Sequence, residues 1–334
     1  MISSSDISVV IQGPVVGVPF DLYDNQKTQQ CIDNIRKHLP HAEIIVSTWE
    51  GTEVHHLKEV DKIVLSKDPG AITYNDYELK NIYNNNNRQI VSTYAGLKVV
   101  TKPYAIKFRC DFQIESLKFL EIFGKYKAVY KKRYFKERIL CLSNTTRDPI
   151  KMPLLNHICD LIQFGYTEDL QKLWNIPLQI EPITTRKYKR SHRFWNDPMF
   201  LGNYRMQYAP EQYIWIAFLK QNNVDLSLKY FCQIPLFKIS RSITEMVDNF
   251  IVYNDNDWGL ISPQRLLASM EVAISTDRWH ELYENICIAK SKRYIIKQNI
   301  LVISCSFLYF KKNVRTVCRI LRDKSYKIIR KKTK

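Results

Sequence analysis

Short β-branched runs alternate with helical patterns over the first third of the chain. Continuous apolar runs of this length are typical of strands buried on both faces of a parallel sheet. Two segments between them, 25–39 and 88–100, carry apolar residues at helical spacing. The order predicts an α/β domain with a mixed, mainly parallel sheet flanked by helices. The predicted strands are ISVVI (7–11), EIIVST (43–48), DKIVLS (61–66) and YAIKFR (104–109).

The rest of the chain gives a less regular pattern. The Asn-rich segment 74–87 predicts a loop over the sheet edge, and 139–143 a further strand. Thr167 is expected to cap a helix that follows residue 165. Helices are also expected over 115–123, from Pro210 and Pro263, which occupy the tolerated first turn, and over 277–290.

The charge of the chain is uneven. The formal net charge is +17, and residues 311–334 hold 11 Lys/Arg against one Asp, so this segment supplies +10. A basic excess indicates an anionic partner, which could be nucleic acid, phospholipid or a phosphorylated substrate. The eight cysteines show no CxxC spacing, and several lie in apolar runs, so we expect buried free thiols in a reducing compartment. No signal peptide or membrane-spanning run of about 18 apolar residues is found, which predicts a cytoplasmic location.

Polar residues follow several of the predicted strands. The carboxyl ends of parallel strands meet at one edge of the sheet, where ligands bind. We therefore expect these residues to form a nucleotide pocket, with Asn87 and Arg88 at the start of the next helix facing an anion. The donor-site candidates are Gln12, Gly13, Thr48, Trp49, Asp68, Asn87, Arg88, Arg109 and Asp111. The absence of G-x-G-x-x-G and of a Gly-rich Lys loop excludes classical dinucleotide and P-loop sites.

Ordered sequence blocks from about residue 6 to 270 resemble the WavE family, which is associated with lipopolysaccharide core or surface-polysaccharide synthesis in bacteria. The blocks are VIQGPV, AEIIVSTWEG, SKDPGA, NRQIVSTYAGL, YAIKFRCDF, HICDLIQFGYTEDL and APEQYIWIAFL. The resemblance implies a glycosyltransferase with a GT-A-like, nucleotide-diphospho-sugar transferase fold. It also implies a nucleotide-sugar donor and a glycan or glycolipid acceptor: lipopolysaccharide core, O-antigen or capsule. No organic cofactor is expected.

In GT-A enzymes a D-x-D motif ends the strand that YAIKFRCD resembles, and its carboxylates hold Mn²⁺ or Mg²⁺ against the donor diphosphate. This chain has Arg109-Cys110-Asp111 instead, so one carboxylate is missing. Three alternatives follow. Asp111 could be the only protein carboxylate on a weak metal site, or Arg109 could neutralise the phosphate directly as a bidentate clamp. In the third, Arg109 and Asp111 only bridge structural elements and touch no ligand.

Transfer with inversion needs a base that deprotonates the acceptor hydroxyl. Asp160, Glu211 and Asp197 are the candidates. Asp160 lies among apolar residues, where an unpaired carboxylate is costly, and Glu211 opens an apolar helix. The ordinary alternatives are a turn at Asp197 before Pro198 and stabilisation of the helix dipole by Glu211.

We expect a transferase domain over 1–295, with a donor half over about 1–125 and an acceptor half over about 126–295. Residues 296–334 form a basic amphipathic tail, in which Val314, Ile320 and Ile328 lie among cations. This pattern predicts peripheral binding to the cytoplasmic face of an anionic inner membrane. Two rival functions remain: a nucleotidyltransferase of nucleotide-sugar synthesis, and a basic nucleic-acid-binding protein. No nucleic-acid partner is expected, because the cations concentrate in the tail and do not interleave with aromatic residues.

Overall fold

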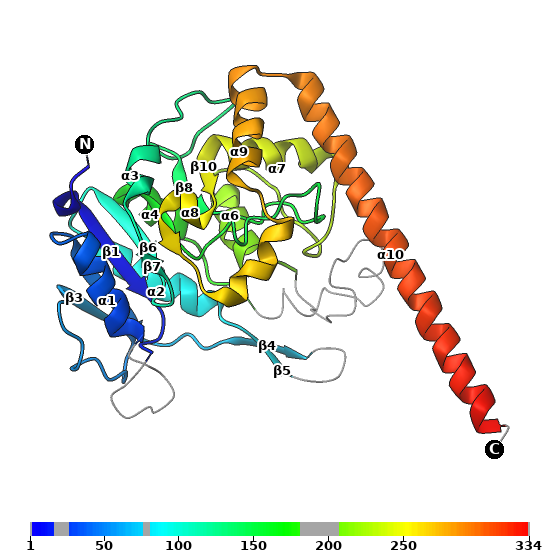
Figure 1. The fold of residues 1–334 in the computed structure, drawn as a ribbon, viewed down its shortest axis with the longest axis horizontal. Coiled ribbons are helices and arrows are strands. Elements are labelled where there is room, and N and C mark those ends of the chain that lie inside the picture. Colours follow the sequence, from blue (N-terminus) through cyan, green and yellow to red (C-terminus); the bar gives the residue numbers. More distant parts are fainter. Residues whose placement is uncertain (1, 17–26, 76–80, 181–206, 333–334) are drawn as a thin grey trace.

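The computed structural model describes residues 2–16, 27–75, 81–180 and 207–332 (Figure 1). Its centre is a seven-stranded sheet in the order β10-β8-β9-β6-β1-β2-β3. The strands are β1 (Ile7–Gln12), β2 (Glu43–Trp49), β3 (Lys62–Ser66), β6 (Tyr104–Phe108), β8 (Ile139–Leu142), β9 (Gln163–Tyr166) and β10 (Phe250–Tyr253). Only β9 is antiparallel to its neighbours in this sheet. The prediction of a mixed, mainly parallel α/β sheet is confirmed.

Helices surround this sheet. Two further pairs of short antiparallel strands lie outside it. The ladders pair β4 (Ile72–Asn75) with β5 (Asn81–Asn84), and β7 (Gln113–Ile114) with β11 (Leu260–Ile261). The helices are α1 (Lys27–His38), α2 (Asn86–Lys98), α3 (Lys118–Ile122), α4 (Thr167–Trp174), α6 (Pro210–Gln221), α7 (Leu236–Asn249), α8 (Asp255–Trp258), α9 (Thr276–Tyr283) and α10 (Lys292–Lys332), with the short helical turns η1 (Ser4–Asp6), η3 (Gln264–Val272) and η4 (Glu284–Ile288).

Helix α2 packs against β1 and β2 at an unusually close approach. Gly96, on the buried face of α2, has no side chain between the helix and the sheet, and a Cβ there would lie 2.4 Å from Val10 Cγ1. Only glycine lets the helix backbone lie this near to the strands. The first turns of α2 are thereby held beside the carboxyl ends of β1 and β2, where they contribute to the site described below.

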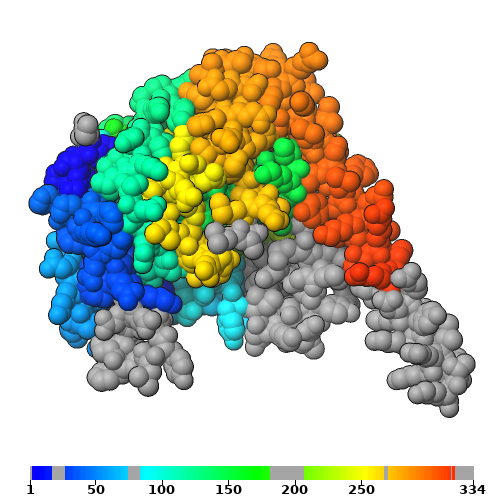
Figure 2. All heavy atoms as spheres, in the orientation of Figure 1, coloured from blue at the N-terminus to red at the C-terminus, as the bar shows by residue number. Residues whose placement is uncertain are grey.

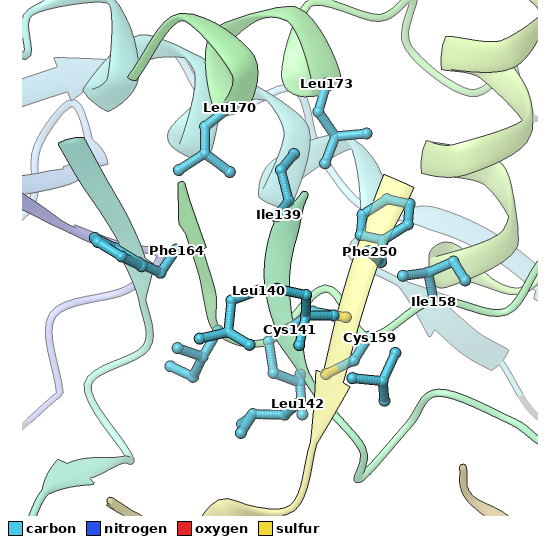
Figure 3. Close-up of a cluster of buried hydrophobic side chains, with 14 of the residues drawn as sticks. Ile139, Leu140, Cys141, Leu142, Ile158, Cys159, Phe164, Leu170, Leu173 and Phe250 are labelled. Carbon is cyan, nitrogen blue, oxygen red and sulfur yellow. The ribbon is translucent and has the colours of Figure 1, made fainter. Parts of the chain in front are cut away.

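The hydrophobic core continues across the other half of the sheet, around β8, β9 and β10 (Figure 3). Leu140 and Phe164 come from β8 and β9, and Leu170 and Leu173 come from α4; all four are fully buried or nearly so. Cys141 and Cys159 lie in the same cluster. All eight cysteines are free and six are buried, as the apolar runs around them predicted.

Several local predictions were wrong. Within the segment expected to be a loop (74–87), β5 pairs with β4, because backbone hydrogen bonds between antiparallel strands need no apolar side chains. Gln163–Tyr166 is a strand, and Ala105 of β6 pairs with Gly165. Thr167 is the first residue of α4 and Tyr166 is its N-cap; the Thr167 hydroxyl donates instead to the Lys102 carbonyl oxygen. Residues 264–272 form a 3₁₀ helix, not an α-helix.

Helix α10 forms the basic tail and is 41 residues long. It begins at Lys292, runs along one flank of the molecule and extends past the sheet at its C-terminal end (Figure 1). Its N-terminal part packs against α7 and η4. Within the described part of the chain, no helix is both long and apolar enough to cross a membrane.

Candidate functional site

A cavity of about 650 Å³ lies at the carboxyl ends of β1, β2, β3 and β6. Gln12 closes β1, Trp49 closes β2, and Asp68 follows β3, while Arg109, Cys110 and Asp111 follow β6. Helix α2 contributes its first turns. The remaining lining residues are Gly13, Pro14, Val16, Lys27, Asn85, Arg88, Gln89, Ser92 and Arg265. This is the sheet edge at which ligands bind in α/β proteins.

Seven of the nine residues predicted for the donor site line this cavity: Gln12, Gly13, Trp49, Asp68, Arg88, Arg109 and Asp111. Thr48 does not, because successive strand residues point to opposite faces; it is fully buried while Trp49 is partly exposed. Asn87 is also turned away. Its side chain forms two hydrogen bonds with the backbone of Gln179, with Nδ2 to O at 2.9 Å and Oδ1 to N at 2.8 Å.

The backbone amide of Gly13, directly after β1, is already paired. Its N–H donates to the Ser47 carbonyl oxygen of β2 at 3.0 Å. Gly13 adopts a φ of +109°, which suits glycine, so it serves the turn that ends β1. The Gly13 N–H is therefore already used within the sheet, and the positive charge of the cavity comes from Lys and Arg side chains.

The first of two arginine–carboxylate pairs in the cavity joins α2 to the loop after β3. Arg88 donates to Asp68 twice, from Nε to Oδ1 at 2.8 Å and from Nη2 to Oδ2 at 2.6 Å. The hydrogen bonds from Arg88 lower the pKa of Asp68. Both side chains are more than a third exposed, so the pair leaves Arg88 accessible from the cavity.

The second pair holds the end of β6. Arg109 donates from Nε to Asp111 Oδ1 at 3.0 Å and from Nη2 to Oδ2 at 2.9 Å. Arg265, from η3, donates to the same Oδ2. Burial alone would raise the pKa of Asp111, but the two guanidinium groups outweigh it and the pKa falls. Asp111 is thus an ionised carboxylate held between two arginines.

These carboxylates are engaged in a way that bears on metal binding. Asp68 and Asp111 are the carboxylates among the described residues that line the cavity, and both oxygens of each accept from a guanidinium group. Across the described ranges, no group of three or more His, Cys, Asp or Glu side chains is placed to hold a metal ion. A divalent cation at a nucleotide site is usually held by one or two carboxylates together with substrate phosphates. Each carboxylate in this cavity would have to exchange an arginine for the metal, so the donor set fits Mn²⁺ or Mg²⁺ poorly.

Of the three predicted catalytic carboxylates, Asp160 and Glu211 do not line the cavity, and Asp197 lies outside the described residues. Asp160 is 3% exposed and sits directly behind the cavity, because its carbonyl oxygen accepts from Nε2 of Gln89, a lining residue, at 3.2 Å. Burial, and then the charge of Glu211, raise the pKa of Asp160 to about 6. The fold thus brings Glu211 close enough for its charge to raise the pKa of Asp160, although the two residues are far apart in sequence.

Glu211 lies in the first turn of α6 and has two basic neighbours. Its Oε2 is 3.6 Å from His157 Nε2. Burial raises the pKa of Glu211, whereas the charge of Arg147 opposes the rise. Burial lowers the pKa of His157 to about 3, so the imidazole is neutral at physiological pH. The side chain of Glu211 keeps 16% of its surface exposed, more than Asp160, so it is the more accessible of the two carboxylates.

Lys107 is a buried cation that was not among the candidates. It is fully buried on β6, and its Nζ donates to the backbone carbonyl oxygens of Asp160 and Leu161. It also lies 5.0 Å from the centre of the Trp174 ring. Burial lowers its pKa to about 8. The lysine fixes the 160–161 backbone against β6 and so positions Asp160.

Arg265 is the main cavity residue that sequence reasoning missed. It lies 154 positions from Asp111 and comes from a helix whose start was predicted only from Ser262-Pro263. Lys27, Gln89 and Ser92 also line the cavity. Gln89 and Ser92 follow Arg88 at one and four positions on α2, so helical spacing from Arg88 was a signal that could have found Ser92.

Comparisons with known proteins add one strong and one weak match. Residues 7–317 match the family model described as "WavE lipopolysaccharide synthesis", which extends beyond the span of 6–270 expected from the sequence blocks and into α10. No curated protein sequence matches the chain. Among solved structures, a cytidylyltransferase from Leptospira borgpetersenii serovar Hardjo-bovis is similar at 10% identity and a TM-score of 0.29. The match covers 52% of this chain and 66%, slightly less than two thirds, of that one.

Proposed function

The chain belongs to the WavE lipopolysaccharide synthesis family, and from this premise we propose that it is a glycosyltransferase. It moves a sugar from a nucleotide donor to a lipopolysaccharide core, O-antigen or capsule acceptor. Membership of the family implies sugar or glycan substrates. The observation that carries the proposal is the cavity at the carboxyl edge of the sheet, lined by an aromatic residue and four cationic side chains.

The cavity has groups suited to each part of a nucleotide sugar. Trp49 offers an aromatic surface for the base. Arg88, Arg109 and Arg265 offer N–H donors for phosphate oxygens, because guanidinium matches phosphate geometry. Its volume of about 650 Å³ is within the range of cofactor and substrate pockets.

The acceptor binds on the side of Asp160 and Glu211. During transfer the acceptor hydroxyl oxygen forms a bond to the anomeric carbon while the bond from that carbon to the diphosphate oxygen breaks. The hydroxyl proton passes to a carboxylate, and the electron pair of the broken bond leaves with the nucleoside diphosphate. Asp160 suits the role of base because a pKa of about 6 keeps it ionised, yet basic, near neutral pH.

A nucleotide panel tests the proposal. We expect UDP, GDP, dTDP or CMP to raise the melting temperature, since a ligand at about 100 times its Kd stabilises the folded state by about 2.7 kcal/mol. Arg88→Gln should weaken this effect about tenfold or more in ligand concentration, through loss of a charged hydrogen bond. Lys98→Gln, at the other end of α2 and exposed, removes the same charge and should leave binding unchanged.

The same assay includes the rival function. If none of the four nucleotides stabilises the protein while single- or double-stranded oligonucleotides do, the protein is a nucleic-acid binder and not a glycosyltransferase. Where a nucleotide binds, its matching nucleotide sugars are offered with a lipopolysaccharide acceptor, and release of the nucleoside diphosphate is measured.

A further inference from the structure

We propose that the cavity binds the donor diphosphate through Arg109 and Arg265 in place of a divalent cation, and that Asp111 positions these two arginines. The inference rests on the proposed function and names how its site recognises the leaving group. The ligand class is a nucleoside diphosphate sugar bound without metal.

The first argument is the engagement of Asp111. A carboxylate has about four lone-pair sites, and three of those on Asp111 are taken, two by Arg109 at 3.0 and 2.9 Å and one by Arg265. A divalent cation at Asp111 would lie beside two positive groups. Asp68, the second carboxylate of the cavity among the described residues, is occupied by Arg88 in the same way.

The second argument is charge balance. The described residues that line the cavity include three arginines, Arg88, Arg109 and Arg265, and two carboxylates, so these five groups have a net positive charge. The doubly negative diphosphate of a nucleotide sugar is attracted to this charge. The same diphosphate already neutralised by Mn²⁺ or Mg²⁺ would gain little from it.

The third argument is geometry. Arg109 uses Nε and Nη2 on Asp111, and within the described structure its Nη1 makes no hydrogen bond. The side chain of Arg265 is 58% exposed and contacts Asp111 through Nη2. Both guanidinium groups therefore keep N–H donors for a ligand while Asp111 fixes their planes. As the glycosidic bond breaks, these donors stabilise the negative charge that develops on the diphosphate.

Isothermal titration with UDP, GDP, dTDP and CMP, in EDTA and in MnCl₂, tests the inference. We expect the nucleotide that binds to do so with a Kd within about twofold in the two buffers. Arg109→Gln and Arg265→Gln should each weaken that binding by about 10- to 100-fold, the loss of a charged hydrogen bond. Lys98→Gln is the matched control on α2, with no expected change.

The outcomes separate the two proposals. Binding in MnCl₂ that disappears in EDTA overturns the arginine clamp and leaves the glycosyltransferase proposal standing. No binding in either buffer overturns the proposed function, and the clamp with it. Asp111→Asn provides a further check. We expect weaker binding that is still independent of Mn²⁺, whereas a loss confined to the MnCl₂ buffer identifies Asp111 as a metal ligand and contradicts the inference.

A different part of the molecule independently carries a second inference. We propose that the outer face of α10, together with the first residues of α7, docks on an anionic phospholipid bilayer. On α10, Ile296, Ile300 and Phe307 are spaced by four and seven residues, so they lie on one face of the helix, and they are 57%, 58% and 66% exposed. Val302 and Cys305 occupy the opposite, buried face.

The start of α7 extends this apolar face. Leu236 and Phe237 are 63% and 82% exposed, which is unusual for side chains of their size. A shallow groove of about 460 Å³ between Leu236 and α10 is lined in part by Ile303, Phe307 and Phe310. Adjacent apolar residues on two elements make a continuous surface larger than a single exposed side chain, and such surfaces mark interaction sites.

Charge identifies the partner. Lys311, Lys312, Arg315 and Arg319 follow the apolar face along α10 and line one shallow hollow. The whole helix holds 13 Lys/Arg and one acid, Asp323. Pairing two copies of α10 would bring these cations together, which disfavours a dimer through this helix. An anionic bilayer accepts both the apolar side chains and the cations. Figure 2 shows the described part of α10, in orange and red, along an outer flank of the molecule.

Vesicle flotation of the full chain tests this surface. We expect binding to phosphatidylcholine vesicles that contain about a third phosphatidylglycerol, and binding at least about tenfold weaker to pure phosphatidylcholine. Phe237→Ser with Phe307→Ser should reduce binding by about tenfold or more, because two large apolar groups no longer enter the lipid. Leu65→Ser, on the exposed face of edge strand β3, is the matched control and should bind as the wild type does.

Two results would contradict the lipid surface. One is equal binding of the double variant and the wild type to the anionic vesicles. The other is a wild-type dimer in size-exclusion chromatography that the double variant converts to a monomer without a change in vesicle binding. The second result would assign the surface to a second copy of the chain.

Discussion

Gly96→Ala provides a test of how the fold builds the donor site. In an isolated helix, alanine is more favourable than glycine by about 1 kcal/mol. In this protein, a Cβ at position 96 would lie 2.4 Å from Val10 Cγ1 and 3.0 Å from Ser47 Cβ. The Ser47 Cβ is attached to the β2 backbone and cannot rotate away, so α2 must move outward.

Overpacking in a tight interface costs about 1–3 kcal/mol, and in this case more than the helix gains. We expect a net loss of about 1–2 kcal/mol in the free energy of unfolding. The corresponding fall in melting temperature is about 1–3 °C, measured by circular dichroism at constant protein concentration. Because Arg88, Gln89 and Ser92 move with α2, the affinity for nucleotide should fall as well.

A double variant identifies the cause. Val10→Ala removes the methyl group that the new Cβ at position 96 would meet first, and it is itself destabilising, because Val10 is fully buried. If the contact is responsible, Gly96→Ala combined with Val10→Ala should cost less than the sum of the single changes. A Gly96→Ala protein as stable as the wild type, or more stable, would refute the close approach of α2 to the sheet.

Three further changes test other parts of the structure. If Asp160 is the base, kcat/KM should fall below pH about 6 as the carboxylate is protonated, and Asp160→Asn should lower the rate and remove this limb; an unchanged limb excludes it. Glu43→Gln should cost about 1–2 kcal/mol at pH 7, because burial raises the pKa of Glu43 but hydrogen bonds, chiefly from Lys62, outweigh it and hold the pKa at about 2, below its ordinary 4.5. That stability is present above pH about 4.5 and is lost as pH falls towards 2, so urea titrations of the variant should depend less on pH in this window. Gly259→Ala should destabilise by more than about 1 kcal/mol, because φ is +81° and the new Cβ would lie 2.6 Å from the Ser116 carbonyl oxygen; an unchanged urea midpoint would contradict this contact.

The sequence by itself determined five of the seven strands of the main sheet and the edge at which the candidate site lies. Runs such as ISVVI and YAIKFR form strands because β-branched and aromatic residues pack well on a doubly covered sheet. Parallel strands end at one edge, so Gln12, Trp49 and Arg109 had to meet there once the strand order was set. The family was also readable, because ordered blocks along the chain carry more information than any single motif.

Only the tertiary structure decided which of those residues are available. Thr48 and Trp49 are neighbours in sequence, but strand alternation buries one and leaves the other at the cavity. Asn87 is taken by Gln179, and Asp111 by Arg265, through contacts between residues 92 and 154 positions apart. Such pairs depend on how distant loops pack together, and the secondary-structure propensity of a segment does not predict them. The arginine that follows β6 was visible in the sequence, whereas the fold decided that Arg265 of η3 donates to the same carboxylate oxygen, Oδ2 of Asp111.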